Sequence, residues 1–214
     1  MIGQSAPIGE PNRFVEHITS LARRVRELEL SAAGGGTQWN DLRVPFNSAK
    51  LGPLNPPSFV QWRDNGAGST GVFGWEFAGN RLEQVYFDAQ LPHGYKEGTP
   101  LSPHVHFVFN NAPTVGQTIR FGLEYTAASG NTVYPLTNII ESTYTITAAD
   151  AQYRHTIVGL PEIDGTDLLI SAMLGCRFYR DGGVDTYTAG LVVSEFDFHF
   201  VVESLGSLEP FSKP

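Results

Sequence analysis

From Trp39 onward, apolar and polar residues alternate in short runs that are separated by turn-forming residues. The last run shows this most clearly, because Phe196, Phe198 and Phe200 alternate with polar residues. Successive side chains of a strand point to opposite faces, so the alternation predicts strands with one buried and one polar face. The predicted strands lie at roughly 70–78, 83–91, 103–110, 118–126, 138–147, 153–159, 166–180 and 191–203.

Eight short antiparallel strands predict an all-β fold, which we interpret as an eight-stranded jelly-roll β-sandwich with two sheets packed face to face. An immunoglobulin-like sandwich and a β-barrel fit the same pattern. The segment 39–68 precedes these strands and is rich in proline and small residues. We expect it to be an extended arm that aromatic side chains clamp to the domain, namely Trp39, Phe46, Phe59 and Trp62.

The first 36 residues follow a different period. Their apolar residues are separated alternately by four and three positions, which is the heptad spacing of a coiled coil. These residues are Phe14, Ile18, Leu21, Val25 and Leu28. We predict a short N-terminal α-helical stalk, with residues 1–36 as an attachment segment and residues 37–214 as the jelly-roll domain. An amphipathic helix packed on its own domain would show the same spacing. Two heptads are too few to decide between this helix and a coiled coil.

Composition narrows the classes of partner. The chain has 214 residues, of which 41% are hydrophobic, and this is enough for a packed core. Its net charge of −8 would repel a phosphate backbone, so no nucleic-acid partner is expected. The sequence contains no apolar run of the ~18 residues that a membrane span needs, and its N-terminus lacks a signal-peptide pattern. We therefore expect no membrane partner and assembly in a cytoplasm.

The single cysteine, Cys176, lies in an apolar run and is expected to be a buried small hydrophobe.

The candidate chemistry is concentrated in an H-x-H sequence. His104 and His106 share one face of their predicted strand, and apolar residues occupy the other face. In jelly-roll order, the last strand lies beside this strand and the strand at 153–159 flanks its other side. That order would bring Asp197 and His199 to the same face, with His155 joining from 153–159.

Three interpretations of this polar face remain open. The histidines can hydrogen-bond across a subunit interface, hold a divalent metal, or face solvent. Imidazoles and carboxylates at cross-strand distance can bind a divalent metal, and three H-x-H pairs around a threefold axis would supply six imidazoles. No other cofactor is expected.

Enzymatic alternatives fit less well. Gly98, His104 and His106 have the spacing of a cupin motif, but Asn110 or Asn111 occupies the glutamate position and no second motif follows. The sequence also lacks the G-x-S-x-G motif of many hydrolases. We therefore expect no enzyme. Binding of a glycan by aromatic residues near loops, such as Trp39, Trp62 or Trp75, is an alternative to their packing in the core.

Four long segments of the chain are similar to segments of a known family. They read WNDLRVPFNSAKLG, DNGAGSTGVFGWEF, LPHGYKEGTPLSPHVHF and ISAMLGCRFYRDGGVDTYTAGLVVSEFDFHFVVESLGSLEPF. In this order they resemble a family of tailed-bacteriophage and metagenomic viral proteins over about residues 39–212. The family consists of virion structural proteins with a jelly-roll body and variable N-terminal helices.

This resemblance implies a bacteriophage virion structural protein that is assembled in the bacterial host cytoplasm. It implies a homotrimeric spike or decoration, such as a capsid-associated head fibre or cement protein, that joins other virion proteins through its N-terminal segment. A tail or baseplate appendage and a host-glycan-binding module are the alternatives, followed by a cupin-type metalloenzyme.

The heptad spacing predicts parallel N-terminal helices without fixing their number, and the family resemblance implies that three chains associate. Replacing both Leu21 and Val25 with Asp should loosen the stalk of this trimer and leave the β-domain folded, because both changes place charges in a buried seam. Multi-angle light scattering at micromolar concentration measures the mass of both proteins. A wild-type chain that is monomeric at this concentration would contradict the prediction.

Overall fold

A computed structural model of the protein describes residues 38–206 and 209. The chain divides into two compact units between Thr37 and Gln38. The heptad residues at positions 14–28 lie outside the described residues, so the stalk stays a prediction. In the described part of the chain, no helix is long and apolar enough to cross a membrane.

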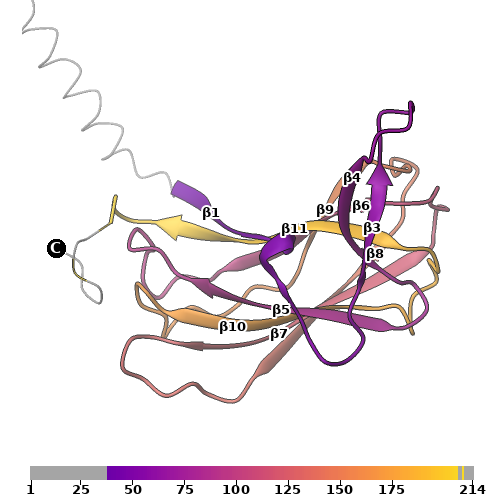
Figure 1. Cartoon of the computed structure of the whole chain (residues 1–214). Coiled ribbons are helices and arrows are strands. Elements are labelled where there is room, and N and C mark those ends of the chain that lie inside the picture. Colours follow the sequence, from indigo (N-terminus) through magenta and orange to yellow (C-terminus); the bar gives the residue numbers. More distant parts are fainter. Residues whose placement is uncertain (1–37, 207–208, 210–214) are drawn as a thin grey trace, which may run out of the picture. The chain divides into compact units, whose positions relative to one another are not determined.

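The described residues form two antiparallel sheets that pack face to face (Figure 1). The six-stranded sheet contains β1 (Gln38–Pro45), β3 (Ser58–Arg63), β4 (Val72–Phe77), β6 (Ser102–Phe109), β9 (His155–Gly159) and β11 (Leu191–Val202). The five-stranded sheet contains β2 (Lys50–Leu51), β5 (Leu82–Gln90), β7 (Thr118–Ala128), β8 (Asn138–Thr145) and β10 (Met173–Asp181). A short 3-10 helix, η1 (Phe46–Ser48), connects β1 to β2.

The strand order confirms the predicted all-β sandwich. One sheet runs β4-β11-β6-β9 and the other runs β5-β10-β7-β8, which is the order expected of a jelly roll. These eight strands correspond to the eight predicted ones. The predicted strand at 166–180 starts only at Met173, because turns occupy the residues before it.

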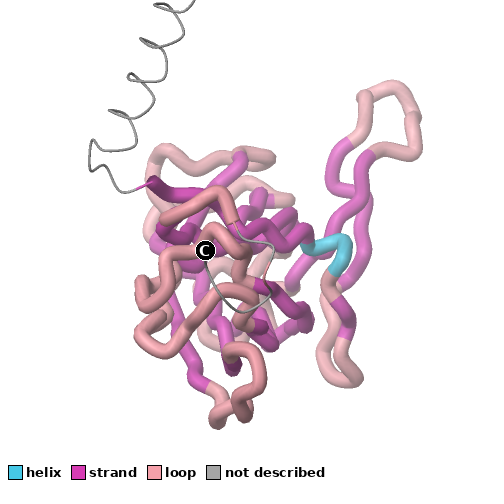
Figure 2. Tube along the Cα trace, turned by 90° about the vertical axis from the view of Figure 1, so that its left-hand side faces the viewer, coloured by secondary structure: helices cyan, strands magenta, loops and turns pink. Residues whose placement is uncertain are grey.

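The segment 39–68 is part of the sheets instead of a separate arm. Its strand β1 pairs with β11, β2 pairs with β5, and β3 pairs with β4. Phe46 is its anchor, because this side chain is fully buried and packs edge-on against Phe178 at 5.2 Å between ring centroids. Trp39 and Phe59 are about half exposed. The loop between β3 and β4 projects beyond the two sheets (Figure 2).

Aromatic side chains from both sheets fill the core. Phe196 of β11 contacts Phe87 of β5 and Phe178 of β10, each at 5.5 Å between ring centroids. Along β11 the residues that enter the core change from odd to even numbers, because a β-bulge shifts the register between Val193 and Glu195. Leu191 and Val193 therefore face inward before the bulge, and the phenylalanines face inward after it.

One cation lies inside this core. Arg180 of β10 is fully buried, and its Nε donates to Asp185 Oδ2 at 2.7 Å. Its other guanidinium nitrogens donate to the backbone carbonyls of Phe77, Tyr187 and Ala189 at 2.6–2.8 Å. A buried charge is tolerated only when it is paired and hydrogen-bonded, and both conditions are met here.

Removing the partner of this cation should strongly destabilise the domain. Asp185→Ala leaves the guanidinium buried without its counter-charge, so we expect the free energy of unfolding to fall by about 3–5 kcal/mol. Urea denaturation followed by tryptophan fluorescence measures this change. Arg43→Ala is the control: it breaks the pair between Arg43 and Glu195, in which the arginine is largely exposed, and should cost much less. Equal losses in the two variants would contradict the prediction.

Candidate functional site

Polar residues of β6, β9 and β11 meet on the outer face of the six-stranded sheet. Antiparallel pairing sets Asp197 of β11 directly opposite His104 of β6. On the other side of β6, His155 of β9 lies opposite Val108, which places it diagonally from His106. The neighbours predicted for the histidine strand, the last strand and the strand at 153–159, are confirmed.

The side chains of this face form a continuous row. His104 Nε2 lies 2.5 Å from Asp197 Oδ1, and His106 Nε2 lies 3.4 Å from Asp197 Oδ2. On its other side, His106 Nδ1 is hydrogen-bonded to His155 Nε2 at 2.8 Å. His104 and Asp197 are buried, at 7% and 3% exposure, although they lie on an outer face. The nitrogen and oxygen atoms of His104, His106 and Asp197 lie close enough together to hold one metal ion.

The pKa values of the two histidines move in opposite directions. Burial alone would lower the pKa of His104, but the contact with Asp197 and its negative charge outweigh burial and raise this pKa. For His106, burial lowers the pKa more than the charge of Asp197 raises it, and His104 and His155 lower it further. The row therefore combines a more basic with a less basic imidazole.

His199 lies beside the row but has its own partner. Its ring centroid is 4.2 Å from that of His104, whereas its Nε2 lies 2.8 Å from Asp41 Oδ1. Asp41 comes from β1 and is directly opposite His199 in the sheet. The sequence does not reveal Asp41 as a site residue, because its segment reads as an arm without a strand partner.

The orientation of His104 and His106 decides whether they can form a cupin-type site inside the sandwich. His104 and His106 point away from the interior, and Phe107 and Phe109, on the opposite side of β6, contribute to the core. This pair therefore forms no site inside the sandwich. It borders an open hollow of about 580 Å³ on the outer face, whose other walls include Ile157 and Leu160.

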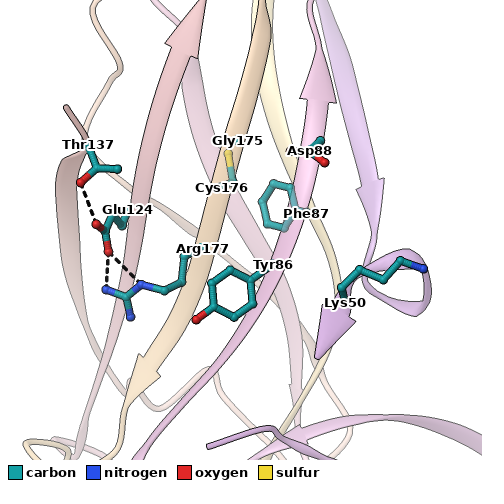
Figure 3. Close-up of a pocket in the computed structure, with 9 residues that line it drawn as sticks. All are labelled: Lys50, Tyr86, Phe87, Asp88, Glu124, Thr137, Gly175, Cys176 and Arg177. Atoms are coloured by element: carbon teal, nitrogen blue, oxygen red, sulfur yellow. Dashed lines mark hydrogen bonds and ion pairs between the residues drawn. The ribbon is translucent and has the colours of Figure 1, made fainter. Parts of the chain in front are cut away.

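A second polar surface lies on the outer face of the five-stranded sheet (Figure 3). Lys50 of β2, Tyr86 of β5, Arg177 of β10 and Glu124 of β7 are successive cross-strand neighbours in one row. Arg177 Nε donates to Glu124 Oε2 at 2.8 Å, and Figure 3 shows Tyr86 on the other side of Arg177. In this row the ring of Tyr86 lies between two cations, Lys50 and Arg177, and the carboxylate of Glu124 follows beyond Arg177.

The adjacent row contains a glycine that leaves space. Gly175 of β10 lies between Asp88 of β5 and Thr126 of β7. A Cβ added to Gly175 would meet the nearest atoms of these two residues only at 3.7 Å, which is ordinary contact. The missing side chain helps to form a hollow of about 390 Å³ on this face, which we call the Gly175 groove. The groove is lined by Lys50, Tyr86, Phe87, Asp88, Glu124, Thr137, Gly175, Cys176 and Arg177.

The polar groups of the Gly175 groove are held in place. Hydrogen bonds from Thr137 and then from Arg177 lower the pKa of the Glu124 carboxyl, which is therefore ionised at neutral pH. Arg177 Nη1 donates to Gln84 Oε1 at 2.8 Å, which fixes the guanidinium from a second side. Burial raises the pKa of Cys176 to about 12, so the cysteine is a buried thiol, as predicted from its apolar run.

The sequence does not point to the Gly175 groove. Its residues are spread over five strands or strand ends and show no motif. The aromatic residues considered from the sequence for sugar stacking lie elsewhere. Trp75 packs on Phe59 at 4.9 Å between ring centroids, and Trp62 lies 6.5 Å from Tyr153.

No protein-family model and no curated protein matches the chain, but several solved structures are similar to it. One similar structure is a family 35 carbohydrate-binding module from an environmental isolate, at 10% identity and a TM-score of 0.41, covering 77% of this chain and 93% of the module. Another is Xyl-CBM35 in complex with a glucuronic acid-containing disaccharide, at 9% identity and a TM-score of 0.38, covering 76% and 99%. A third is TmCBM27, a mannan-recognising carbohydrate-binding module, at 14% identity and a TM-score of 0.35, covering 76% and 98%.

Proposed function

We propose that the β-sandwich is a non-catalytic glycan-binding module and that the Gly175 groove is its binding site. The observation that carries the proposal is the row of Tyr86, Arg177 and Glu124 beside the space above Gly175. The half-buried ring of Tyr86 offers an apolar face to the C–H groups of a sugar. The neighbouring charged groups offer donors and acceptors to its hydroxyls.

The fixed geometry of the groove favours binding of a sugar. The Arg177 guanidinium is held by Glu124 and Gln84, so little side-chain entropy is lost when a ligand binds. The ring of Tyr86 is supported by Gly52, where an added Cβ would approach the ring to 2.2 Å. A volume of about 390 Å³ lies within the range of roughly 300–1,000 Å³ typical of ligand sites.

The charge of the groove favours a neutral glycan. Lys50 and Arg177 are balanced by Asp88 and Glu124. The whole chain carries a net charge of −8, which repels strongly anionic ligands at long range. We therefore propose neutral hexose- or pentose-containing glycans, rather than polyanionic ones, as the ligand class.

We further propose that the module is displayed on a bacteriophage virion as a homotrimer. The support is the sequence resemblance over about residues 39–212 and the heptad spacing of the N-terminal segment. Three linked copies would raise the apparent affinity for a surface glycan well above that of one shallow groove. A module that recognises host glycans agrees with a surface appendage, on the tail as well as on the capsid.

Filling the groove should abolish glycan binding without damaging the fold. Gly175→Val places its side chain in the hollow, where the first added atom meets only ordinary contacts, and valine suits a strand better than glycine. A screen of neutral glycans identifies the ligand, and titration calorimetry should then show at least a tenfold loss for this variant and for Tyr86→Ala. Thermal unfolding of Gly175→Val should occur at or above the wild-type temperature.

Phe59→Ala serves as the matched control, because Phe59 is an exposed aromatic residue on the other sheet. It should bind the glycan as the wild type does. Wild-type binding by Gly175→Val, or the absence of any glycan ligand in the screen, would refute the assignment of the groove.

The attachment proposal has a separate test. Deleting residues 1–36 should leave a folded domain, since residues from Gln38 onward form a compact unit, but the shortened protein should no longer join particles. Immunoblots of purified virions measure its incorporation. Normal occupancy of the shortened protein would place the docking surface on the sandwich instead.

A further inference from the structure

We propose that His104, His106 and Asp197 form a binding site for a divalent transition metal, with Zn²⁺ as its preferred ion. This site lies on the six-stranded sheet and is independent of the glycan groove. Two imidazoles and one carboxylate are a donor set of known metal sites that keep coordination positions open. In this chain a single β-strand pairing, that of β6 with β11, brings the three side chains together.

The first argument is that the donor atoms converge, and two of them lack a hydrogen bond. Asp197 Oδ1 and His106 Nε2 are both buried, and neither has a hydrogen-bond partner among the described residues. His104 Nε2 lies 2.5 Å from Asp197 Oδ1, a contact that is an ion pair only when His104 is protonated. A buried polar atom without a hydrogen bond is unfavourable, and a cation between these atoms would remove that cost.

The second argument concerns the far side of the His106 ring. His106 Nδ1 is hydrogen-bonded to His155 Nε2 at 2.8 Å. When Nδ1 is the donor, the lone pair of His106 lies on Nε2 and faces the carboxylate of Asp197, 3.4 Å away. A metal-binding histidine typically has its other ring nitrogen fixed in this way by a neighbouring acceptor. His155 thus positions a ligand and is not itself one.

The third argument is the size and charge of the site. The donor atoms lie within 4.8 Å of one another. Two ligand atoms of a tetrahedral Zn²⁺ site, each at about 2.1 Å from the metal, lie about 3.4 Å apart, so the most widely separated donors need to close by up to about 1.4 Å. In the surrounding row, Asp41, Glu195 and Asp197 carry three negative charges against one on Arg43, which attracts a cation.

The donor types select the class of metal. Mg²⁺ and Ca²⁺ prefer oxygen ligands, whereas imidazole nitrogen suits Zn²⁺, Ni²⁺ and Co²⁺. All three donors come from one chain, so no symmetry copy is required. The remaining coordination positions would be open to water or to a ligand in the adjoining hollow of about 580 Å³.

The test uses the full-length protein without a histidine tag, stripped of metal with a chelator. Calorimetric titration with ZnCl₂ should show one ion per chain, and CoCl₂ should give the visible absorption bands of protein-bound Co²⁺. CaCl₂ and MgCl₂ should give neither signal. Bound Zn²⁺ should raise the thermal unfolding temperature, because it binds only the folded site.

Three variants locate the ion. Asp197→Asn with His106→Ala should abolish Zn²⁺ binding, and His155→Ala should weaken it by about 10–100-fold. The matched control is His199→Ala, which removes a histidine packed on His104 whose Nε2 faces Asp41, and it should keep full stoichiometry. Circular dichroism verifies that each variant is folded. A wild-type protein that binds neither Zn²⁺ nor Co²⁺, or a loss of Zn²⁺ in His199→Ala equal to that in the double variant, would overturn the proposal.

Discussion

The antiparallel register between β6 and β11 is the constraint on which the rest of the structure depends. It sets Phe196 against Val105 on the inner side and Asp197 against His104 on the outer side. A slip of one residue would turn every side chain of a strand to the opposite face. The same pairing therefore decides which phenylalanines fill the core and which polar groups meet outside it. The bulge between Val193 and Glu195 completes this arrangement, because it lets both halves of β11 bury their apolar residues.

The sandwich carries two chemically different outer faces on one rigid core. On the five-stranded sheet, charges of opposite sign neutralise one another around an aromatic ring and an empty glycine position. On the six-stranded sheet, imidazoles and a buried carboxylate converge, and two of their atoms lack a hydrogen-bond partner among the described residues. Both sets of side chains stand on strands, which hold functional groups more precisely than loops do. The first face suits a neutral polar ligand, and the second suits a cation.

Much of the fold and part of the site follow from residue alternation. The strands β4 to β11 are readable from period-two patterns, and parity alone places His104, His106, Asp197 and His199 on outer faces. The rest depends on pairing partners that a pattern does not contain. Asp41 joins the row because β1 pairs with β11, and the Gly175 groove exists because β2, β5, β7, β8 and β10 lie side by side. From the sequence alone, a glycine in a strand indicates only a weakened strand, and its role in a groove becomes visible once its neighbours are known.

Arg180 shows how unevenly a buried interaction can restrict sequence change. Three of its four partners are main-chain carbonyls, which any residue at those positions supplies. Substitutions at Phe77, Tyr187 and Ala189 therefore keep these hydrogen-bond acceptors, and only packing limits which residues can stand there. Position 180 has no such freedom, because lysine offers a point charge where the cavity requires a planar fork of donors. Homologous sequences should keep the arginine and its carboxylate while the residues that accept its hydrogen bonds diverge.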